Sequence, residues 1–216
     1  MEVARQPRQP EPIQPVAADW RATRTECLWH RSGLTDLHMD AVRTIDPATA
    51  PWATAYEILE RQGQTDDGYM VAFCGNRGTG KTQCAAHLIR RTVERDQKAR
   101  YAKLSALVRQ VYDSYSDRTR RTDAIIREAA EVRLLVLDEC HEALRKEDAR
   151  AIFTDIFDNR YGTRQRNTIL IANERREALA AMLGDSVTSR LIEKGGVVEF
   201  NHPSFRRQPE WARGLR

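Results

Sequence analysis

The sequence lacks any long apolar run and any closely spaced pair of cysteines. No stretch approaches the roughly 18 uncharged apolar residues that a membrane-spanning helix needs, and the N-terminus carries no apolar segment that could act as a secretion signal. The four cysteines lie far apart without a CxxC pair, which favours reduced thiols over a disulfide framework or a structural zinc site. With a mean hydropathy of −0.64, we expect a cytoplasmic protein without a membrane partner.

Lysine is scarce as well, because only five of the 35 basic residues are lysine and the rest are arginine. The planar guanidinium group suits the recognition of phosphate and carboxylate groups, although arginine-rich codon usage gives the same composition. The formal net charge of +4 permits binding to a polyanion without requiring it. Cys27, His30 and His38 could supply three metal ligands, but such a group is more often an ordinary packed or surface cluster.

The length of 216 residues fits one main domain with short appendages. Residues 1–18 contain four prolines and little apolar surface, so we expect a disordered arm there. Residues 19–54 carry short amphipathic pieces broken by prolines, which predicts a small helical N-terminal segment. The main domain is expected to occupy residues 55–202, followed by a C-terminal tail at 203–216.

Short apolar runs alternate with amphipathic segments along the main domain. Strands are expected at residues 69–75, 99–102, 133–139, 167–172 and 196–200. Helices are expected at residues 51–62, 82–95, 104–115, 124–130 and 148–160, with two short helices in 175–193. This alternation predicts a three-layer α/β fold with a mainly parallel sheet.

A glycine-rich turn follows the first of these strands and precedes a helix. It satisfies the P-loop pattern, GxxxxGK followed by Ser or Thr, with the residues Gly75, Asn76, Arg77, Gly78, Thr79, Gly80, Lys81 and Thr82. The glycines let successive backbone N–H groups face an anion at the positive end of the next helix. Lys81 can reach the β- and γ-phosphates of a nucleoside triphosphate, and the Thr82 hydroxyl can ligate Mg²⁺.

An acidic pair ends a later apolar strand, where residues 134–139 read LLVLDE and match the Walker B pattern. Asp138 can hold Mg²⁺ through water, and Glu139 can orient and deprotonate the attacking water. Such a pair could instead cap the next helix, but a P-loop in the same chain favours the role in nucleotide chemistry.

Residues 138–141 also spell the DExH box of helicases, which need two tandem lobes and a Ser-Ala-Thr motif after the next strand. This chain has room for one lobe and carries Ile171, Ala172 and Asn173 at that place. An asparagine there is instead the sensor position of AAA+ ATPases, where the amide faces the γ-phosphate. A simple helix N-cap is the alternative for Asn173.

These motifs occur in an order that resembles the DnaC/IstB group of AAA+ proteins, the helicase loaders of bacteria and phages and their relatives in transposition. The similarity is strongest over about residues 53–206 and includes further motifs at 158–161, 183–191 and 203–206. The resemblance implies a P-loop NTPase fold with an AAA+ core at 55–202, and ATP with Mg²⁺ as the bound nucleotide.

The resemblance also implies roles for two arginines. Arg190 would be the arginine finger that enters the nucleotide site of a neighbouring subunit, which would couple hydrolysis to an ATP-dependent oligomer. An ordinary surface position is the alternative for Arg190. Arg206 would contact the nucleotide, although the adjoining Arg207 could serve instead. The helicase-docking domain of several loaders is expected to be absent or reduced to residues 1–50, and no full helical lid is expected.

Relatives in this group hold single-stranded DNA with the region that follows the second strand. The corresponding region here, 103–121, contains Arg109, Tyr112, Tyr115, Arg118, Arg120 and Arg121. Arginines could follow the phosphates while a tyrosine stacks on a base. Alternatively, the two tyrosines are core residues on one helix face and the arginine run is a solvated loop.

Three functions are compatible with these motifs. The first, which we favour, is a helicase-loader-like ATPase of DNA replication, with a replicative helicase and single-stranded DNA as partners. The second is an IstB-like ATPase that regulates a transposase. The third is a nucleotide-binding adaptor with little turnover.

Overall fold

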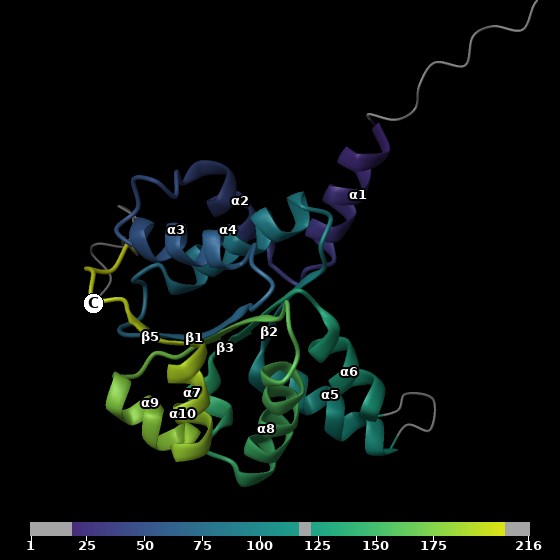
Figure 1. Cartoon of the computed structure of the whole chain (residues 1–216), viewed down its shortest axis with the longest axis vertical. Coiled ribbons are helices and arrows are strands. Elements are labelled where there is room, and N and C mark those ends of the chain that lie inside the picture. Colours follow the sequence, from purple (N-terminus) through teal and green to yellow (C-terminus); the bar gives the residue numbers. More distant parts are fainter. Residues whose placement is uncertain (1–18, 117–121, 206–216) are drawn as a thin grey trace, which may run out of the picture.

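A parallel β-sheet forms the centre of the molecule in the computed structural model, which describes residues 19–116 and 122–205 (Figure 1). Its strands are β1 (Tyr69–Cys74), β2 (Ala99–Lys103), β3 (Leu134–Asp138), β4 (Asn167–Ile171) and β5 (Gly195–Glu199). They lie in the order β2-β3-β4-β1-β5, and each neighbouring pair is parallel. The predicted parallel sheet is confirmed.

Helices cover both faces of this sheet (Figure 1). One face carries α1 (Asp19–His30), α2 (Asp36–Thr44), α3 (Ala53–Gln62) and α4 (Lys81–Glu94). The other carries α5 (Leu104–Ser116), α6 (Thr122–Glu131), α7 (Cys140–Ala143), α8 (Glu147–Tyr161), α9 (Arg176–Leu183) and α10 (Asp185–Lys194). The three-layer α/β architecture is therefore confirmed. The expected strands and the expected helices after residue 50 begin and end within about two residues of the observed ones. Among the helices of the described residues, only the short helix α7 was not expected.

The apolar run of β1 is explained by burial on both sides of the sheet. Tyr69, Val71 and Phe73 belong to the core under α1–α4, whereas the alternate residues Met70 and Ala72 belong to the core under α5–α10. A strand covered on both faces needs an uninterrupted apolar sequence. The edge strands β2 and β5 are only partly buried, which is why their sequences give a weaker signal.

The N-terminal helices are packed onto the main domain. Helices α1 and α2 contact α4, the helix that follows the P-loop, and Trp29, Leu34 and Met39 are buried at this contact. Each fully buried apolar side chain of this size contributes about 1.5–3 kcal/mol to folding. Residues 19–44 therefore form one core with the domain instead of standing apart from it.

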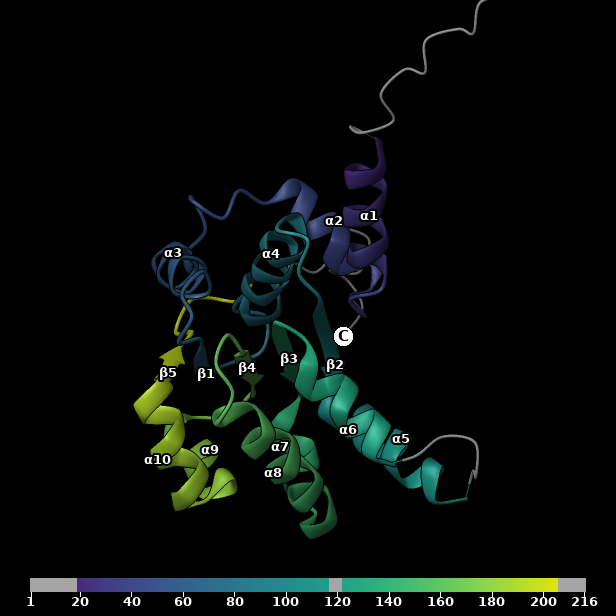
Figure 2. The same ribbon diagram turned by 45° about the vertical axis from the view of Figure 1, so that its right-hand side comes forward.

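On the opposite face, α5 and α6 lie side by side and extend away from the sheet (Figure 2). The segment 117–121 between them lies outside the described residues. Within 19–116 and 122–205, no helix is long and apolar enough to cross a membrane.

Candidate nucleotide site

The glycine-rich turn leads from β1 directly into α4, as the P-loop pattern predicts. Gly75 and Gly80 have φ angles of 121° and 93°, in the left-handed region that favours glycine. A Cβ atom at Gly75 would lie 2.6 Å from the carbonyl oxygen of Phe200, and one at Gly80 would lie 2.6 Å from Nε1 of Trp52. Both positions therefore require glycine for their conformation and for the space around them.

Lys81 is the first residue of α4 and is buried beneath the loop. Its Nζ donates hydrogen bonds to the carbonyl oxygens of Gly75 (2.8 Å) and Asn76 (2.6 Å). The hydroxyl of Thr79, also buried, donates to the same Asn76 carbonyl at 2.9 Å. These bonds hold an ammonium group beside the positive end of a helix, where an anion is favoured.

Thr82 and Asp138 meet beside the loop, because Thr82 Oγ1 donates to Asp138 Oδ2 at 2.9 Å. Tyr101 donates its hydroxyl to the same Oδ2 at 2.8 Å, and the backbone N–H of Glu139 donates to Oδ1 at 2.7 Å. Burial, with Asp138 next to it, raises the pKa of Tyr101 far above its ordinary value, so this hydroxyl remains a donor. A hydroxyl beside a carboxylate is a set of oxygen ligands that suits Mg²⁺.

Glu139 and Asn173 come together from the ends of the adjacent strands β3 and β4. Asn173 Nδ2 donates to Glu139 Oε2 at 2.9 Å. The backbone N–H of Asn173 lies 3.3 Å from His141 Nδ1 and donates to it. Arg175 occupies the N-cap position of α9, so Asn173 is not the N-cap of that helix and that alternative is wrong. Glu139 does occupy the N-cap position of α7, as the alternative for the acidic pair expected, but its side chain makes no capping bond there and accepts from Asn173 instead.

His141 brings a second group of ligand atoms together. Glu139, His141 and Glu142 each offer one such atom, and these atoms lie within 4.8 Å of one another. Glu142 also lies 3.8 Å from the guanidinium of Arg77, and His141 Nε2 lies 3.5 Å from Glu139 Oε2. The acid and the histidine of the DExH pattern therefore belong to one polar network around Glu139.

A cavity of about 400 Å³ opens between the P-loop and the acidic residues. It is lined by the P-loop residues Arg77, Gly78, Gly80 and Lys81, and by Thr82, Asp138, Glu139 and Asn173. The rest of the wall was not predicted from the sequence to belong to a nucleotide site. It consists of Leu37, His38 and Ala41 of α2, Gln83 of α4, and Phe205. The backbone N–H of Phe205 donates to the carbonyl oxygen of Gly78 at 2.9 Å. Arg206 and its alternative Arg207 lie outside the described residues.

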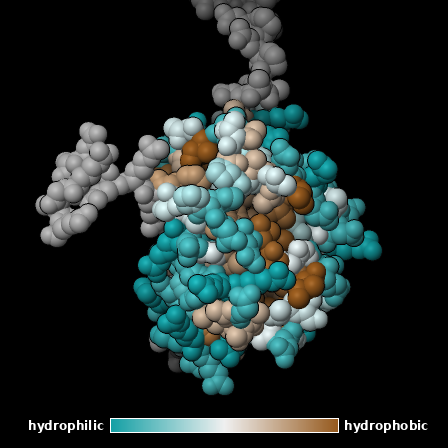
Figure 3. Space-filling model, turned by 90° about the vertical axis from the view of Figure 1, so that its left-hand side faces the viewer, coloured by the Kyte–Doolittle hydropathy of each residue, from teal (hydrophilic) through white to brown (hydrophobic). Residues whose placement is uncertain are grey.

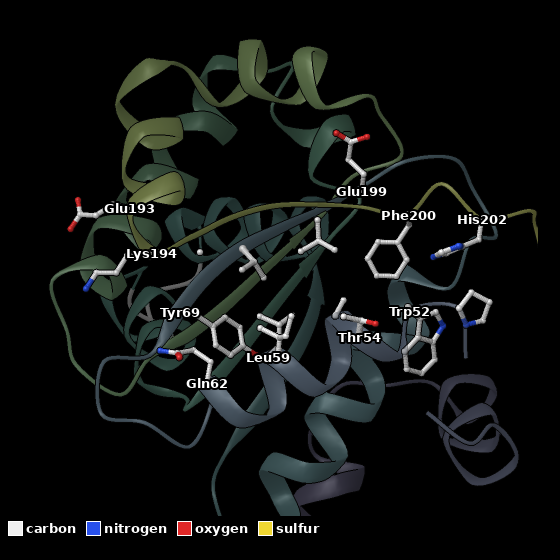
Figure 4. Close-up of a pocket in the computed structure, with 16 residues that line it drawn as sticks. Trp52, Thr54, Leu59, Gln62, Tyr69, Glu193, Lys194, Glu199, Phe200 and His202 are labelled. Atoms are coloured by element: carbon white, nitrogen blue, oxygen red, sulfur yellow. The ribbon is translucent and has the colours of Figure 1, made fainter. Parts of the chain in front are cut away.

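A larger cavity, about 730 Å³, lies between α3 and β5, on the side of the molecule shown in Figure 3, where a band of hydrophobic residues crosses a largely hydrophilic surface. Trp52, Leu59, Tyr69 and Phe200 surround it (Figure 4). Its wall contains neither the glycine-rich loop nor the acidic pair. The smaller polar cavity holds both of these motifs and is therefore the candidate nucleotide site.

Arg190 does not line the polar cavity of its own chain. It lies on α10 and pairs with the carboxylate of Asp158, and its guanidinium carbon is 5.3 Å from the centre of the Tyr161 ring. Tyr161 in turn donates its hydroxyl to Glu193 Oε2 at 2.6 Å. Any contact of Arg190 with a nucleotide in this arrangement would be with a nucleotide bound to another chain.

The expected DNA-binding residues are only partly described. Arg109, Tyr112 and Tyr115 are exposed on α5, with the two tyrosine rings 6.2 Å apart. The alternative in which both tyrosines are core residues is therefore wrong. Arg118, Arg120 and Arg121 lie outside the described residues.

Solved structures share this fold. The crystal structure of the DnaC helicase loader aligns with a TM-score of 0.65 at 17% sequence identity, covering 76% of this chain and 99% of that chain. The crystal structure of DnaI aligns with a TM-score of 0.58, also at 17% identity, covering 76% of this chain and 89% of that chain. At this level of identity, the likeness concerns the fold.

Sequence comparison identifies the family. The chain is 30% identical over 191 residues to the uncharacterized protein YdaV of Escherichia coli (strain K12), an alignment that covers 86% of this chain and 76% of that protein. The sequence model of the IstB-like ATP binding protein family matches residues 53–212, which include the whole candidate site except its α2 wall. The chain therefore belongs to the IstB-like ATP binding proteins, in the DnaC/IstB-like group of AAA+ ATPases.

Proposed function

We propose that this protein binds ATP with Mg²⁺ in the polar cavity and hydrolyses it, as a helicase-loader-like ATPase of DNA replication. One observation carries the proposal. The P-loop, the Thr82–Asp138 pair and the Glu139–Asn173 pair converge on one cavity at the carboxyl ends of three adjacent parallel strands. Membership of an ATP-binding family supports the choice of nucleotide.

Each group has a distinct task in this proposal. The loop N–H groups and Lys81 bind the phosphates, while Thr82 and Asp138 hold Mg²⁺, which neutralises phosphate charge when bound. Glu139 accepts a proton from the attacking water. Its Oε2 is occupied by the Asn173 amide, whereas Oε1 has no hydrogen-bond partner among the described residues and is available to water.

The partners follow from position and exposure. We propose that the helical N-terminal segment, residues 19–54, docks a replicative helicase and that Arg109, Tyr112 and Tyr115, with Arg118, Arg120 and Arg121, bind single-stranded DNA. Arg190 acts as an arginine finger between copies of the chain, and Arg206 contacts the nucleotide. The exposure of Arg109, Tyr112 and Tyr115 on α5 supports the DNA contact.

A second candidate is the regulation of a transposase, and the match to the IstB-like family favours it. The same nucleotide site would serve either partner. A pull-down of the full chain against the replicative helicase and the transposase of the host separates the two. Capture of the helicase supports the first function, and capture of the transposase alone supports the second.

Turnover measurements test the enzymatic part. Wild-type protein is expected to hydrolyse ATP, and single-stranded DNA is expected to change the rate. Lys81→Ala should lose ATP binding, whereas Glu139→Gln should keep binding but lose about 100-fold or more in turnover, because the general base is removed. Wild-type protein that binds ATP without hydrolysing it would instead be the nucleotide-binding adaptor.

A further inference from the structure

Helix α2 brings a histidine to the nucleotide cavity that no P-loop motif predicts. His38 is half-buried and lines the cavity with Lys81, Thr82 and Asp138. Its ring packs edge-on against Tyr101, with ring centres 5.4 Å apart and an interplanar angle of 63°. Since Tyr101 holds the Asp138 carboxylate, His38 lies one side chain away from the proposed metal ligands.

The two ring nitrogens of His38 have different surroundings. Nδ1 lies 3.1 Å from the hydroxyl oxygen of Thr35 and shares a hydrogen bond with it. Nε2 has no hydrogen-bond partner among the described residues. When the Thr35 hydroxyl donates to Nδ1, Nε2 carries the ring proton and is the nitrogen left to donate into the cavity.

Burial is the main influence on the charge of His38. It lowers the pKa of His38 and so favours the neutral ring, while the nearby Asp138 opposes that change and Lys103 adds to it. A neutral N–H donor can contact a phosphate oxygen without the cost of burying a second cation beside Lys81.

We propose that His38 is a further nucleotide-contacting residue, whose Nε2 donates a hydrogen bond to the terminal phosphate of bound ATP. The inference rests on the proposed nucleotide site. The terminal phosphate is chosen because His38 lines the cavity together with Asp138, Glu139 and Asn173, the groups assigned to the metal and the attacking water. ADP lacks that phosphate and makes no such contact.

Contact between His38 and the nucleotide would also hold the N-terminal helix α2 more firmly on the domain. Helix α2 is anchored on α4 by buried apolar side chains such as Met39, and the phosphate contact would add a nucleotide-dependent anchor. The amides of α2 would then exchange more slowly with solvent in the ATP state than in the ADP state. The stability of the segment that we propose as the docking site of a partner would thus depend on which nucleotide is bound.

Two substitutions separate contact from packing. Asparagine places its amide near the position of Nδ1, and glutamine places its amide near that of Nε2. His38→Asn should therefore keep the side near Thr35 and lose the phosphate contact, whereas His38→Gln should retain a donor in the cavity. His30→Asn on α1 is the matched control, because His30 is exposed and lies 3.2 Å from Glu26 Oε1, outside the cavity.

Calorimetric titration of the full chain with Mg²⁺ and either ATPγS or ADP measures the effect. His38→Asn is expected to weaken ATPγS binding about 10-fold and to leave ADP binding within about 2-fold, as for one hydrogen bond to a charged group. His38→Gln and His30→Asn should stay close to wild type. In wild-type protein, ATPγS and not ADP should slow hydrogen exchange in residues 36–44, a readout that needs no variant to fold.

Three results would overturn the inference in different ways. Unchanged ATPγS binding by folded His38→Asn, with unchanged exchange of α2, would remove His38 from the site and leave the proposed function intact. Equal losses for ATPγS and ADP would show a packing role only. Wild-type protein that binds neither nucleotide would overturn the proposed function itself, and the His38 contact with it.

Discussion

Glu139 combines a proposed catalytic carboxylate with an unfavourable backbone conformation. Its φ of 53° lies in the left-handed region, which costs a residue with a Cβ about 1–2 kcal/mol. Both Glu139→Ala and Glu139→Gly remove the carboxylate and should abolish turnover. The glycine variant should nevertheless unfold at a higher urea concentration than the alanine variant, by about 1 kcal/mol in unfolding free energy, because glycine adopts this φ without strain.

The control is the same comparison of alanine with glycine at an ordinary helical position, where alanine should be the more stable of the two. Ala180 lies inside α9, where glycine should be about 1 kcal/mol less stable than alanine. Should Glu139→Gly be the less stable of its pair as well, the left-handed conformation of Glu139 would carry no cost and the backbone argument would be wrong.

Tyr101 is expected to position the metal ligand. Tyr101→Phe removes one of the two side-chain donors to Asp138 Oδ2 and leaves Thr82 as the other. A hydrogen bond to a charged group is worth about 1.5 kcal/mol, so the Mg²⁺ concentration needed for half-maximal turnover should rise about 10-fold. Tyr112→Phe, which alters an exposed tyrosine on α5, should leave it unchanged. An equal effect of both substitutions would contradict a role specific to Tyr101.

At the scale of elements, Arg160 joins three segments of the fold. It is 1% exposed, and its guanidinium donates to Thr168 and to four backbone carbonyl oxygens, those of Ala129, Ala130, Val132 and Asn167. Burial lowers its pKa to about 9, and the charge of Arg166 adds to the effect. This side chain therefore ties the end of α6 and the start of β4 to α8.

Loss of Arg160 should destabilise the whole domain. Arg160→Met keeps much of the side-chain volume but leaves buried carbonyl oxygens without a donor, so the unfolding free energy should fall by at least about 3 kcal/mol. Arg160→Lys should recover little of this, because an ammonium cannot reproduce the planar fork. Urea unfolding measures both, with exposed Arg164→Met as the matched control. A fall of less than 1 kcal/mol, which is about one hydrogen bond, would contradict the role of Arg160.

Some features of the fold and of the site can be predicted because the residues that determine them are neighbours in the sequence. The strands β1, β3 and β4 were predicted because burial on both faces leaves an unbroken apolar run, and the P-loop because its glycines are adjacent in sequence. Tyr101 and His38 were not assigned to the nucleotide site, since they reach it through strand register and helix packing. The motif at residues 158–161 has no signal of its own beyond the family resemblance, and the buried hydrogen bonds of Arg160 provide its structural reason.

At the scale of the whole molecule, one buried histidine should make stability depend on pH. His87 is 5% exposed between Trp52 and Tyr56, and its Nε2 has no hydrogen-bond partner among the described residues. Burial lowers its pKa from the ordinary 6.5, and the nearby Asp46 only partly opposes this. The unfolded chain therefore binds the proton of His87 more readily than the folded chain. The free energy of unfolding is thus highest above about pH 6.5 with respect to this group and falls as the pH drops below that value.

His87→Phe should reduce that loss of stability, because phenylalanine fills the aromatic cluster and does not titrate. The difference in urea midpoint between pH 8 and pH 5.5 should shrink relative to wild type. Some difference should remain, since burial lowers the pKa of His38 in the same direction. An unchanged difference in the variant would mean that His87 contributes nothing to the acid sensitivity.

Assembly is the largest scale at which Arg190 can be tested. The pair of Arg190 with Asp158 is partly exposed, so it is worth little and can be released when another chain offers a phosphate. If the finger acts between copies, Arg190→Ala and Glu139→Gln should each lose turnover when assayed alone. An equal mixture of the two should regain about a quarter of the wild-type rate. The reason is that an intact nucleotide site faces an intact finger in one of the four possible arrangements of two neighbouring copies. The mixture must be compared with Lys81→Ala combined with Glu139→Gln, in which no copy has a complete nucleotide site and no turnover should return. If the first mixture stays as inactive as its components while each variant still binds ATP, Arg190 does not act across an interface, and the loss caused by Arg190→Ala must arise within its own chain.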